Sequence, residues 1–208
     1  MKAKPLVSSG KPLLVVEVKL KVRNLGALRK QLAALGCHEE VARSFEDNWT
    51  WDFPGQELRR NGKLLRVRQF AGHCSLTFKG PAGRSRLFKI REESETEVRD
   101  FTELSCILER LGMVVSFRYQ KFRTSYSLAL PGGRQSVNVL LDETPIGNYL
   151  EIEGPARAIE AVAAKLGYKK EDFINESYVG LFFKSALRKR RNFMTFTESD
   201  HEENPWVV

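Results

Sequence analysis

The ten residues LLVVEVKLKV at positions 13–22 alternate between two kinds of side chain. One face of an extended strand would carry only apolar residues, namely Leu14, Val16, Val18, Leu20 and Val22. The opposite face would carry Val15, Glu17, Lys19 and Lys21. This alternation predicts a β-strand with one buried apolar face. Because the other face holds charges of both signs, it is either an ordinary solvated surface or one wall of a charged interior site.

The composition is that of a folded protein with an anionic partner. The chain has 208 residues, of which 42% are hydrophobic, so it can form one large domain, or one domain and a tail, around a real core. Its formal net charge of +8 favours nucleotides, polyphosphates, nucleic acid or anionic lipid as ligands, without choosing among them.

Cysteine usage and hydropathy indicate the compartment. Cys37, Cys74 and Cys106 form no CxxC pair, so we expect neither a disulfide framework nor a zinc site, and a reducing environment. The first residues, MKAKPLVSSGKPLLVV, lack the pattern of a signal peptide, and no apolar run reaches the roughly 18 residues of a membrane span. We therefore expect a soluble, cytoplasmic protein with no membrane partner.

Strand patterns dominate the chain. They are predicted at 13–23, 43–53, 63–70, 73–79, 86–95, 113–130, 134–142 and 148–153. Tight turns such as Asn61-Gly62 separate successive strands, which indicates antiparallel pairing. Helical periodicity predicts helices at 24–36, 98–111, 155–166 and 171–185. The fold class is therefore α+β: a closed antiparallel barrel or a sandwich, with helices packed outside.

Three regions follow from these patterns. Residues 1–12 form an N-terminal arm, and residues 13–185 form the barrel domain. Residues 186–208 combine a basic RKRRN cluster with an acidic ESDHEENP segment. We expect them to be a flexible or partner-docked C-terminal tail.

Charge recurs on one face of nearly every predicted strand. The residues concerned are Glu17, Lys19, Lys21, Arg66, Arg68, Lys79, Lys89, Arg91, Glu93, Glu95, Lys121, Arg123, Asp142, Glu151 and Glu153. For a single strand, a solvated outer face is the simpler explanation. The helices, however, also need an apolar surface to cover. If they cover the apolar strand faces, a closed sheet directs the charges into its lumen, which suits a small ligand.

A lumen of mixed charge needs ions that balance it. Clustered carboxylates are costly to bury without partners, and oxygen ligands of this kind suit magnesium or manganese. The lysines and arginines would bind a multiply charged anion. A polyphosphate with its metal ions satisfies both requirements.

Five sequence segments resemble the motifs of one known superfamily. They are LLRVR at 64–68, LTFKGP at 76–81, REESE at 91–95, KFR at 121–123 and LDETPIGNYLEIEG at 141–154. Together with the first strand they resemble the CYTH superfamily, the triphosphate tunnel metalloenzymes, over roughly 13–185. The resemblance implies an eight-stranded antiparallel barrel that forms a tunnel. It also implies a small triphosphate substrate and Mg²⁺ or Mn²⁺ as cofactor.

The resemblance also implies roles for individual residues. Glu17 and Lys19 match the second Glu and the Lys of the ExExK hallmark. The implied metal ligands are Glu17, Glu151 and Glu153, with Glu93, Glu95 and Asp142 as further ligands or water-positioning groups. The implied phosphate-binding residues are Lys19, Arg66, Arg68, Lys79, Lys89, Arg91, Lys121 and Arg123. Lys19 is also the candidate for activating the attacking water, a role that requires a lowered pKa.

The first position of the hallmark departs from the pattern. It should be Glu, and this chain has Val15. The loss of one anionic ligand is expected to weaken metal binding, to alter metal preference or number, or to abolish turnover.

Several functions therefore remain open. The first prediction is hydrolysis of an inorganic or organic triphosphate. The second is an adenylyl cyclase that converts ATP to cyclic AMP and pyrophosphate; Trp49 and Trp51 would either stack a base or pack in the barrel wall. The third, motivated by Val15, is a polyphosphate- or nucleotide-binding protein without catalysis. Nucleic acid is not expected as a partner, because no recognition motif supports it. A homodimer stays open.

Overall fold

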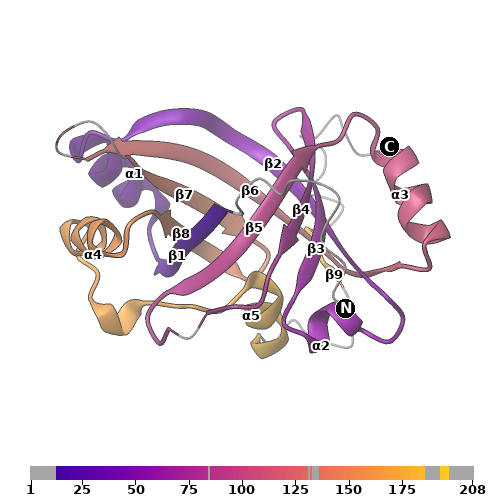
Figure 1. Ribbon diagram of the computed structural model, residues 1–208. Coiled ribbons are helices and arrows are strands. Elements are labelled where there is room, and N and C mark those ends of the chain that lie inside the picture. The colour runs from indigo at the N-terminus through magenta and orange to yellow at the C-terminus, as the bar shows by residue number, and fades with distance from the viewer. Residues whose placement is uncertain (1–12, 84, 131, 133–135, 186–192, 197–208) are drawn as a thin grey trace.

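Eight strands close into an antiparallel barrel, as predicted. The computed structural model describes residues 13–83, 85–130, 132, 136–185 and 193–196. The strands are β1 Leu13–Val22, β2 His38–Asp52, β3 Leu64–Phe70, β4 His73–Lys79, β5 Lys89–Glu97, β6 Val114–Ala129, β7 Ser136–Thr144, β8 Gly147–Glu153 and β9 Phe193–Met194. Their order is β2-β3-β4-β5-β1-β8-β7-β6-β9, and pairing of β2 with β6 closes the ring (Figure 1).

Helices lie on the outside of this ring (Figure 1). They are α1 Leu25–Ala34, α2 Glu57–Arg60, α3 Phe101–Arg110, α4 Ala156–Lys165 and α5 Tyr178–Lys184, with a 3₁₀ turn at Lys170–Asp172. Asn24 and Asp100 cap α1 and α3 by accepting a backbone N–H in the first turn. None of the helices in the described ranges is long and apolar enough to cross a membrane.

The apolar face of β1 is covered by α1 and α4. Val18 and Leu20 are fully buried, and they belong to one core cluster with Leu32 of α1 and Ile159 of α4. The same cluster includes Ile152 of β8. Helices therefore bury the apolar strand faces, and the opposite faces point into the barrel.

A second layer forms where α3 covers β2 and β3. Trp51 and Val67 are buried there against Leu108 of α3. Trp49 packs against Phe101, with ring centroids 4.6 Å apart. Both tryptophans therefore pack on the outer surface of the barrel, so of the two alternatives that the sequence left open the structure shows packing in the barrel wall.

The predicted helix at 171–185 is wrong in its first half. Only Tyr178–Lys184 is α-helical. Before it, Ile174 forms a bridge with Lys19 through two backbone hydrogen bonds of 2.9 Å, which holds this segment extended. A long-range backbone pairing thus overrides the local helical pattern.

Three further features were not predicted. β2 begins at His38, five residues early, because its first residues pair with the far end of β6. Helix α2 forms where the Asp52 carboxylate accepts backbone N–H groups of Leu58 and Arg59. From the tail, Phe193–Met194 adds a short parallel strand to β6 and so docks on the chain's own barrel. The arm at 1–12 and the tail segments 186–192 and 197–208 lie outside the described residues.

Candidate functional site

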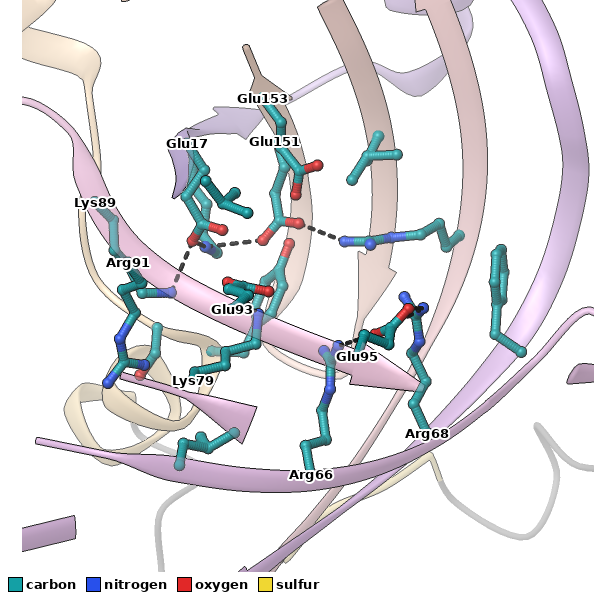
Figure 2. Close-up of a pocket in the computed structure, with 18 of the residues that line it drawn as sticks. Glu17, Arg66, Arg68, Lys79, Lys89, Arg91, Glu93, Glu95, Glu151 and Glu153 are labelled. Carbon is teal, nitrogen blue, oxygen red and sulfur yellow. Dashed lines mark hydrogen bonds and ion pairs between the residues drawn. The ribbon is translucent and has the colours of Figure 1, made fainter. Parts of the chain in front are cut away.

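The barrel encloses a cavity of about 820 Å³. Its wall comes from β1, β3, β4, β5, β6, β7 and β8, and Tyr178 of α5 closes part of it. Figure 2 shows charged side chains from several strands pointing toward one another inside the barrel. The charged strand faces are therefore the walls of an interior site, and the simpler explanation of a solvated outer surface does not apply to them.

The cavity wall carries more positive than negative charge. The eight basic residues are Lys19, Arg66, Arg68, Lys79, Lys89, Arg91, Lys121 and Arg123. The five acidic residues are Glu17, Glu93, Glu95, Glu151 and Glu153. Eight against five leaves an excess of three positive charges among the lining residues, and the buried carboxylates of Glu46 and Asp142, which pair with Lys121 and Arg123 behind the wall, reduce it to one. All eight predicted phosphate-binding residues and five of the six predicted metal ligands therefore line one space.

Strands β1 and β8 together form the acidic wall. Their antiparallel register sets Glu17 opposite Glu153 and Lys19 opposite Glu151. The Lys19 ammonium lies 2.9 Å from a Glu17 oxygen and 2.8 Å from a Glu151 oxygen, so it bridges the two carboxylates. Lys89 of β5 reaches the same Glu17 oxygen at 2.7 Å (Figure 2).

These contacts determine the charge states on this wall. Burial alone would raise the pKa of Glu17, but Lys19 and Lys89 outweigh it, and the pKa falls well below its usual value. Burial alone would lower the pKa of Lys19, but Glu151 and Glu17 raise it above its usual value. Lys19 is therefore a firmly protonated ammonium group. The lowered pKa that a water-activating base would need is absent in this arrangement.

Glu153 differs from its acidic neighbours. Glu17, Glu93, Glu95 and Glu151 each have a basic partner within 4 Å, whereas Glu153 makes no ion pair with any residue in the described ranges. Burial, followed by the charge of Glu151, raises its pKa. This carboxylate would gain most from a bound cation.

Strands β3, β4 and β5 form the facing wall. Lys79 pairs with Glu93 at 2.7 Å, and Arg68 pairs with Glu95 at 3.2 Å. Thr77 donates a hydrogen bond of 2.6 Å to Glu95. Burial, with a further effect from Arg66, lowers the pKa of Lys79 to about 8. A nearby anion would favour the protonated form of this lysine.

Asp142 does not line the cavity. It is fully buried behind the wall, where its oxygens accept hydrogen bonds from Lys121 at 3.0 Å, from Arg123 at 2.6 Å and from the Tyr178 hydroxyl at 2.6 Å. This geometry suits a residue that orients the side chains of Lys121 and Arg123 better than it suits a metal ligand.

Sequence reasoning missed two members of this buried network. Glu46 of β2 is fully buried and lies 3.3 Å from Lys121. Tyr178 falls within the predicted helix at 171–185, and the centroid of its ring lies 5.1 Å from the Lys19 ammonium. Alternation along β2 was the available signal for Glu46. For Tyr178 no sequence signal existed. Lys21 lies outside the residues that line the cavity and is bound to Tyr149 and the carbonyl of Ile146.

The acidic wall fits a hard divalent cation by its chemistry but is not a preformed cage. Glu17, Glu151 and Glu153 bring carboxylate oxygens together on two adjacent strands, and such oxygens are the ligands of magnesium and manganese. Across the described residues, no three His, Cys, Asp or Glu side chains already surround a point where a metal would fit. Lys19 now bridges Glu17 and Glu151, so a cation would have to share or displace these contacts.

The fold and the site define a class of protein: an antiparallel barrel whose lumen is lined by charged side chains of both signs. A family model, the CYTH domain, matches residues 13–178. The chain therefore belongs to the CYTH domain family. Members of this family are enzymes, adenylyl cyclases and triphosphatases among them, and are generally metal-dependent.

Individual relatives agree with this assignment. A candidate adenylate cyclase of Methanocaldococcus jannaschii is 24% identical over 177 residues, covering 80% of this chain and 97% of its own. The solved structure of a Pyrococcus horikoshii protein matches with a TM-score of 0.65 and 26% identity, covering 79% of this chain and 96% of that one. The structure of a candidate adenylyl cyclase from Hippeastrum, described as having a dominant triphosphatase activity, matches with a TM-score of 0.57 and 17% identity. The match covers 81% of this chain and 94% of that one.

Proposed function

We propose that this protein is a Mg²⁺- or Mn²⁺-dependent enzyme that hydrolyses a small triphosphate inside its barrel. One observation carries the proposal: eight basic and five acidic side chains line a single cavity inside the barrel. A buried excess of positive charge is costly unless an anion compensates it. A triphosphate supplies several negative charges in a compact chain, and the acidic wall supplies ligands for the metal that accompanies it.

The basic residues would hold the phosphate chain. Arg66 and Arg68 on β3 and Lys79 on β4 line one wall, and Lys121 and Arg123 on β6 line another. Guanidinium groups bind phosphate oxygens through two parallel N–H donors, and lysines act as point charges. Most of these side chains now hold a carboxylate, so substrate binding exchanges a protein oxygen for a phosphate oxygen without burying a new cation.

Hydrolysis then depends on position and charge. A water oxygen bonds to the terminal phosphorus, the bond to the bridging oxygen breaks, and the diphosphate end leaves with the electron pair of that bond. The water proton passes to a phosphate oxygen, and the attacked phosphorus is released as orthophosphate. The Lys19 ammonium would donate hydrogen bonds that orient an oxygen of the reacting group and stabilise its charge. A divalent cation bound by Glu17, Glu151 and Glu153 would supply further charge neutralisation.

Adenylyl cyclase activity is the second candidate. The relative from Methanocaldococcus jannaschii, 24% identical, supports it by name. In that reaction the ribose 3′-oxygen attacks the α-phosphorus and pyrophosphate leaves, so the site must also hold a purine. Trp49 and Trp51 pack outside the barrel and do not serve that purpose. Hydrolysis, which needs no base pocket, is therefore our first choice. Binding without turnover, motivated by Val15, is the third.

Product analysis separates the three. Purified protein is incubated with inorganic triphosphate, ATP or thiamine triphosphate, each with Mg²⁺ or Mn²⁺, and the products are identified. Orthophosphate from wild type, lost in Glu153→Gln and kept in the matched control Glu97→Gln, supports the hydrolase; Glu97 is exposed and lies outside the cavity lining. Cyclic AMP would transfer the assignment to a cyclase. Tight binding without product under either metal would contradict both enzymes.

A further inference from the structure

Arg91 has an unusual position among the basic residues of the cavity. Its guanidinium donates a hydrogen bond to the carbonyl oxygen of Gly62, and its Nε is buried without a hydrogen-bond partner. It lies on β5, two residues along from Lys89, at the margin of the site (Figure 2). A guanidinium has five N–H donors, so most of the donor capacity of Arg91 is available to a ligand.

The other seven basic residues of the cavity all have an acidic partner. Each of Lys19, Arg66, Arg68, Lys79, Lys89, Lys121 and Arg123 lies within 4 Å of a glutamate or aspartate oxygen. Arg91 makes no ion pair with any residue that the structure describes. The excess positive charge of the cavity is therefore least compensated at this residue.

The reason lies directly across the sheet. Arg91 is the antiparallel partner of Val15, and both side chains line the cavity. Directly opposed side chains have Cβ atoms about 5 Å apart. A glutamate at position 15 would lie within reach of the Arg91 guanidinium and would neutralise it, much as Glu17 now pairs with its own cross-strand partner, Lys89. Leu13 and Leu140 also line the cavity and bring no charge.

We propose that Val15 makes this end of the cavity a metal-independent anion subsite, in which Arg91 binds a terminal phosphoryl group that no β1 carboxylate competes for. Position 15 then determines how the ligand is held. With valine, Arg91 is free to bind the anion directly. With glutamate, Arg91 would be occupied, and the anion would need a cation as a bridge. The inference rests on the proposed function only in taking a triphosphate as the ligand.

Calorimetric titration with inorganic triphosphate tests the subsite, first in EDTA and then in Mn²⁺. Wild type is expected to keep measurable affinity in EDTA. Arg91→Gln and Val15→Glu should each weaken binding in EDTA about tenfold or more, the usual effect of losing a hydrogen bond to a charged group. The matched control Val15→Gln has the size of glutamate without its charge and should remain within about threefold of wild type.

Two comparisons sharpen the result. In Val15→Glu, the ratio of affinity in Mn²⁺ to affinity in EDTA should rise about tenfold over that of Val15→Gln, because glutamate adds a cation ligand while occupying Arg91. In an Arg91→Gln background, Val15→Glu should weaken binding in EDTA much less than it does in wild type. Equal effects of glutamate and glutamine at position 15, or the absence of any binding in EDTA, would overturn the proposal.

Failure of this inference is distinct from failure of the proposed hydrolase. The titrations measure binding and do not depend on turnover, whereas the hydrolase is tested by orthophosphate release. Wild type that binds triphosphate in EDTA through Arg91 but releases no product would keep the subsite and refute the hydrolase. If thermal unfolding shows that Val15→Glu destabilises the barrel, Arg91→Gln carries the test, since its side chain donates one described hydrogen bond.

Discussion

At the centre of β1, between Glu17 and Leu20, the two faces of the strand are equally buried and chemically opposite. On the outer face, Val18 and Leu20 are both 0% exposed beneath the helices. On the inner face, Glu17 is 6% exposed and Lys19 is 2% exposed. Burial therefore does not distinguish the core of this barrel from its site. The difference lies in what each side chain needs from its neighbours.

The outer face requires only apolar neighbours, because hydrophobic burial has no preferred direction. The inner face requires specific partners at hydrogen-bond distance, since a buried charge without one is costly. Lys19 has two such partners, and Glu17 has two. Glu153 and Arg91 have no oppositely charged partner among the described residues, and they are the groups that a cation and an anion would complete.

Replacing Asp142 with asparagine should have the largest effect on stability. The change keeps the shape of the side chain but removes the charge that holds Lys121 and Arg123, and breaking a buried ion pair costs about 3–5 kcal/mol. Urea unfolding measures it. Arg43→Gln, which removes a half-exposed ion pair with Glu143, is the control and should cost under about 1 kcal/mol. Equal losses of unfolding free energy in the two variants would mean that the buried ion pairs contribute no more than solvent-exposed ones.

Leu20→Ala tests the outer face in the same assay. Leu20 is completely buried beneath the helices, so its truncation leaves a cavity and should cost about 3 kcal/mol. Triphosphate affinity should remain close to that of wild type, because Leu20 does not line the cavity. A large loss of affinity at unchanged stability would show that the two faces are not separable.

Glu153→Gln should separate stability from function on the inner face. Turnover with Mg²⁺ should fall about 100-fold, within the usual range for losing one group that stabilises a transition state. Unfolding in EDTA should show no loss of stability, since the raised pKa of Glu153 means that its ionised form is disfavoured in the folded protein. Marked destabilisation would instead assign Glu153 a structural role.

Lys79 should give the smallest effect, visible as pH dependence. Burial and Arg66 lower its pKa to about 8, and a bound anion favours its protonated form, so affinity should fall as the pH rises through 8. Lys79→Arg stays protonated throughout this range. Comparing the two proteins from pH 6.5 to about 9.5 cancels the ionisation of the triphosphate itself, and the wild type should lose up to about tenfold more affinity. Parallel curves would contradict the shifted pKa.

Much of the site was predictable because strand alternation is a local property. The two-residue repeat put Glu17 and Lys19 on one face of β1, and the same rule placed Arg66, Arg68 and both late glutamates on their strands. The need to bury helical faces then directed these charges inward. The prediction of an eight-stranded barrel with outer helices is confirmed.

Other features required contacts between residues far apart in the sequence. The chain at 171–177 is not α-helical because Ile174 pairs with Lys19, some 150 positions earlier. Asp142 carries a charge on the correct face, yet Lys121, Arg123 and Tyr178 occupy its oxygens behind the wall. The residues next to Asp142 in the sequence do not indicate that these three side chains contact it.

The sequence by itself determined which residues share a face of each strand and which strands carry charged residues. It also determined that valine occupies position 15, where the motif has glutamate. Only the tertiary structure decided which charges are satisfied. It did so through register: β1 aligns with β8 so that Lys19 bridges two glutamates, and with β5 so that Arg91 faces a valine. Strand alternation determines the face of the sheet on which a side chain lies. Closure of the barrel determines what it meets there, and in a buried site the energy of a charge depends on that partner.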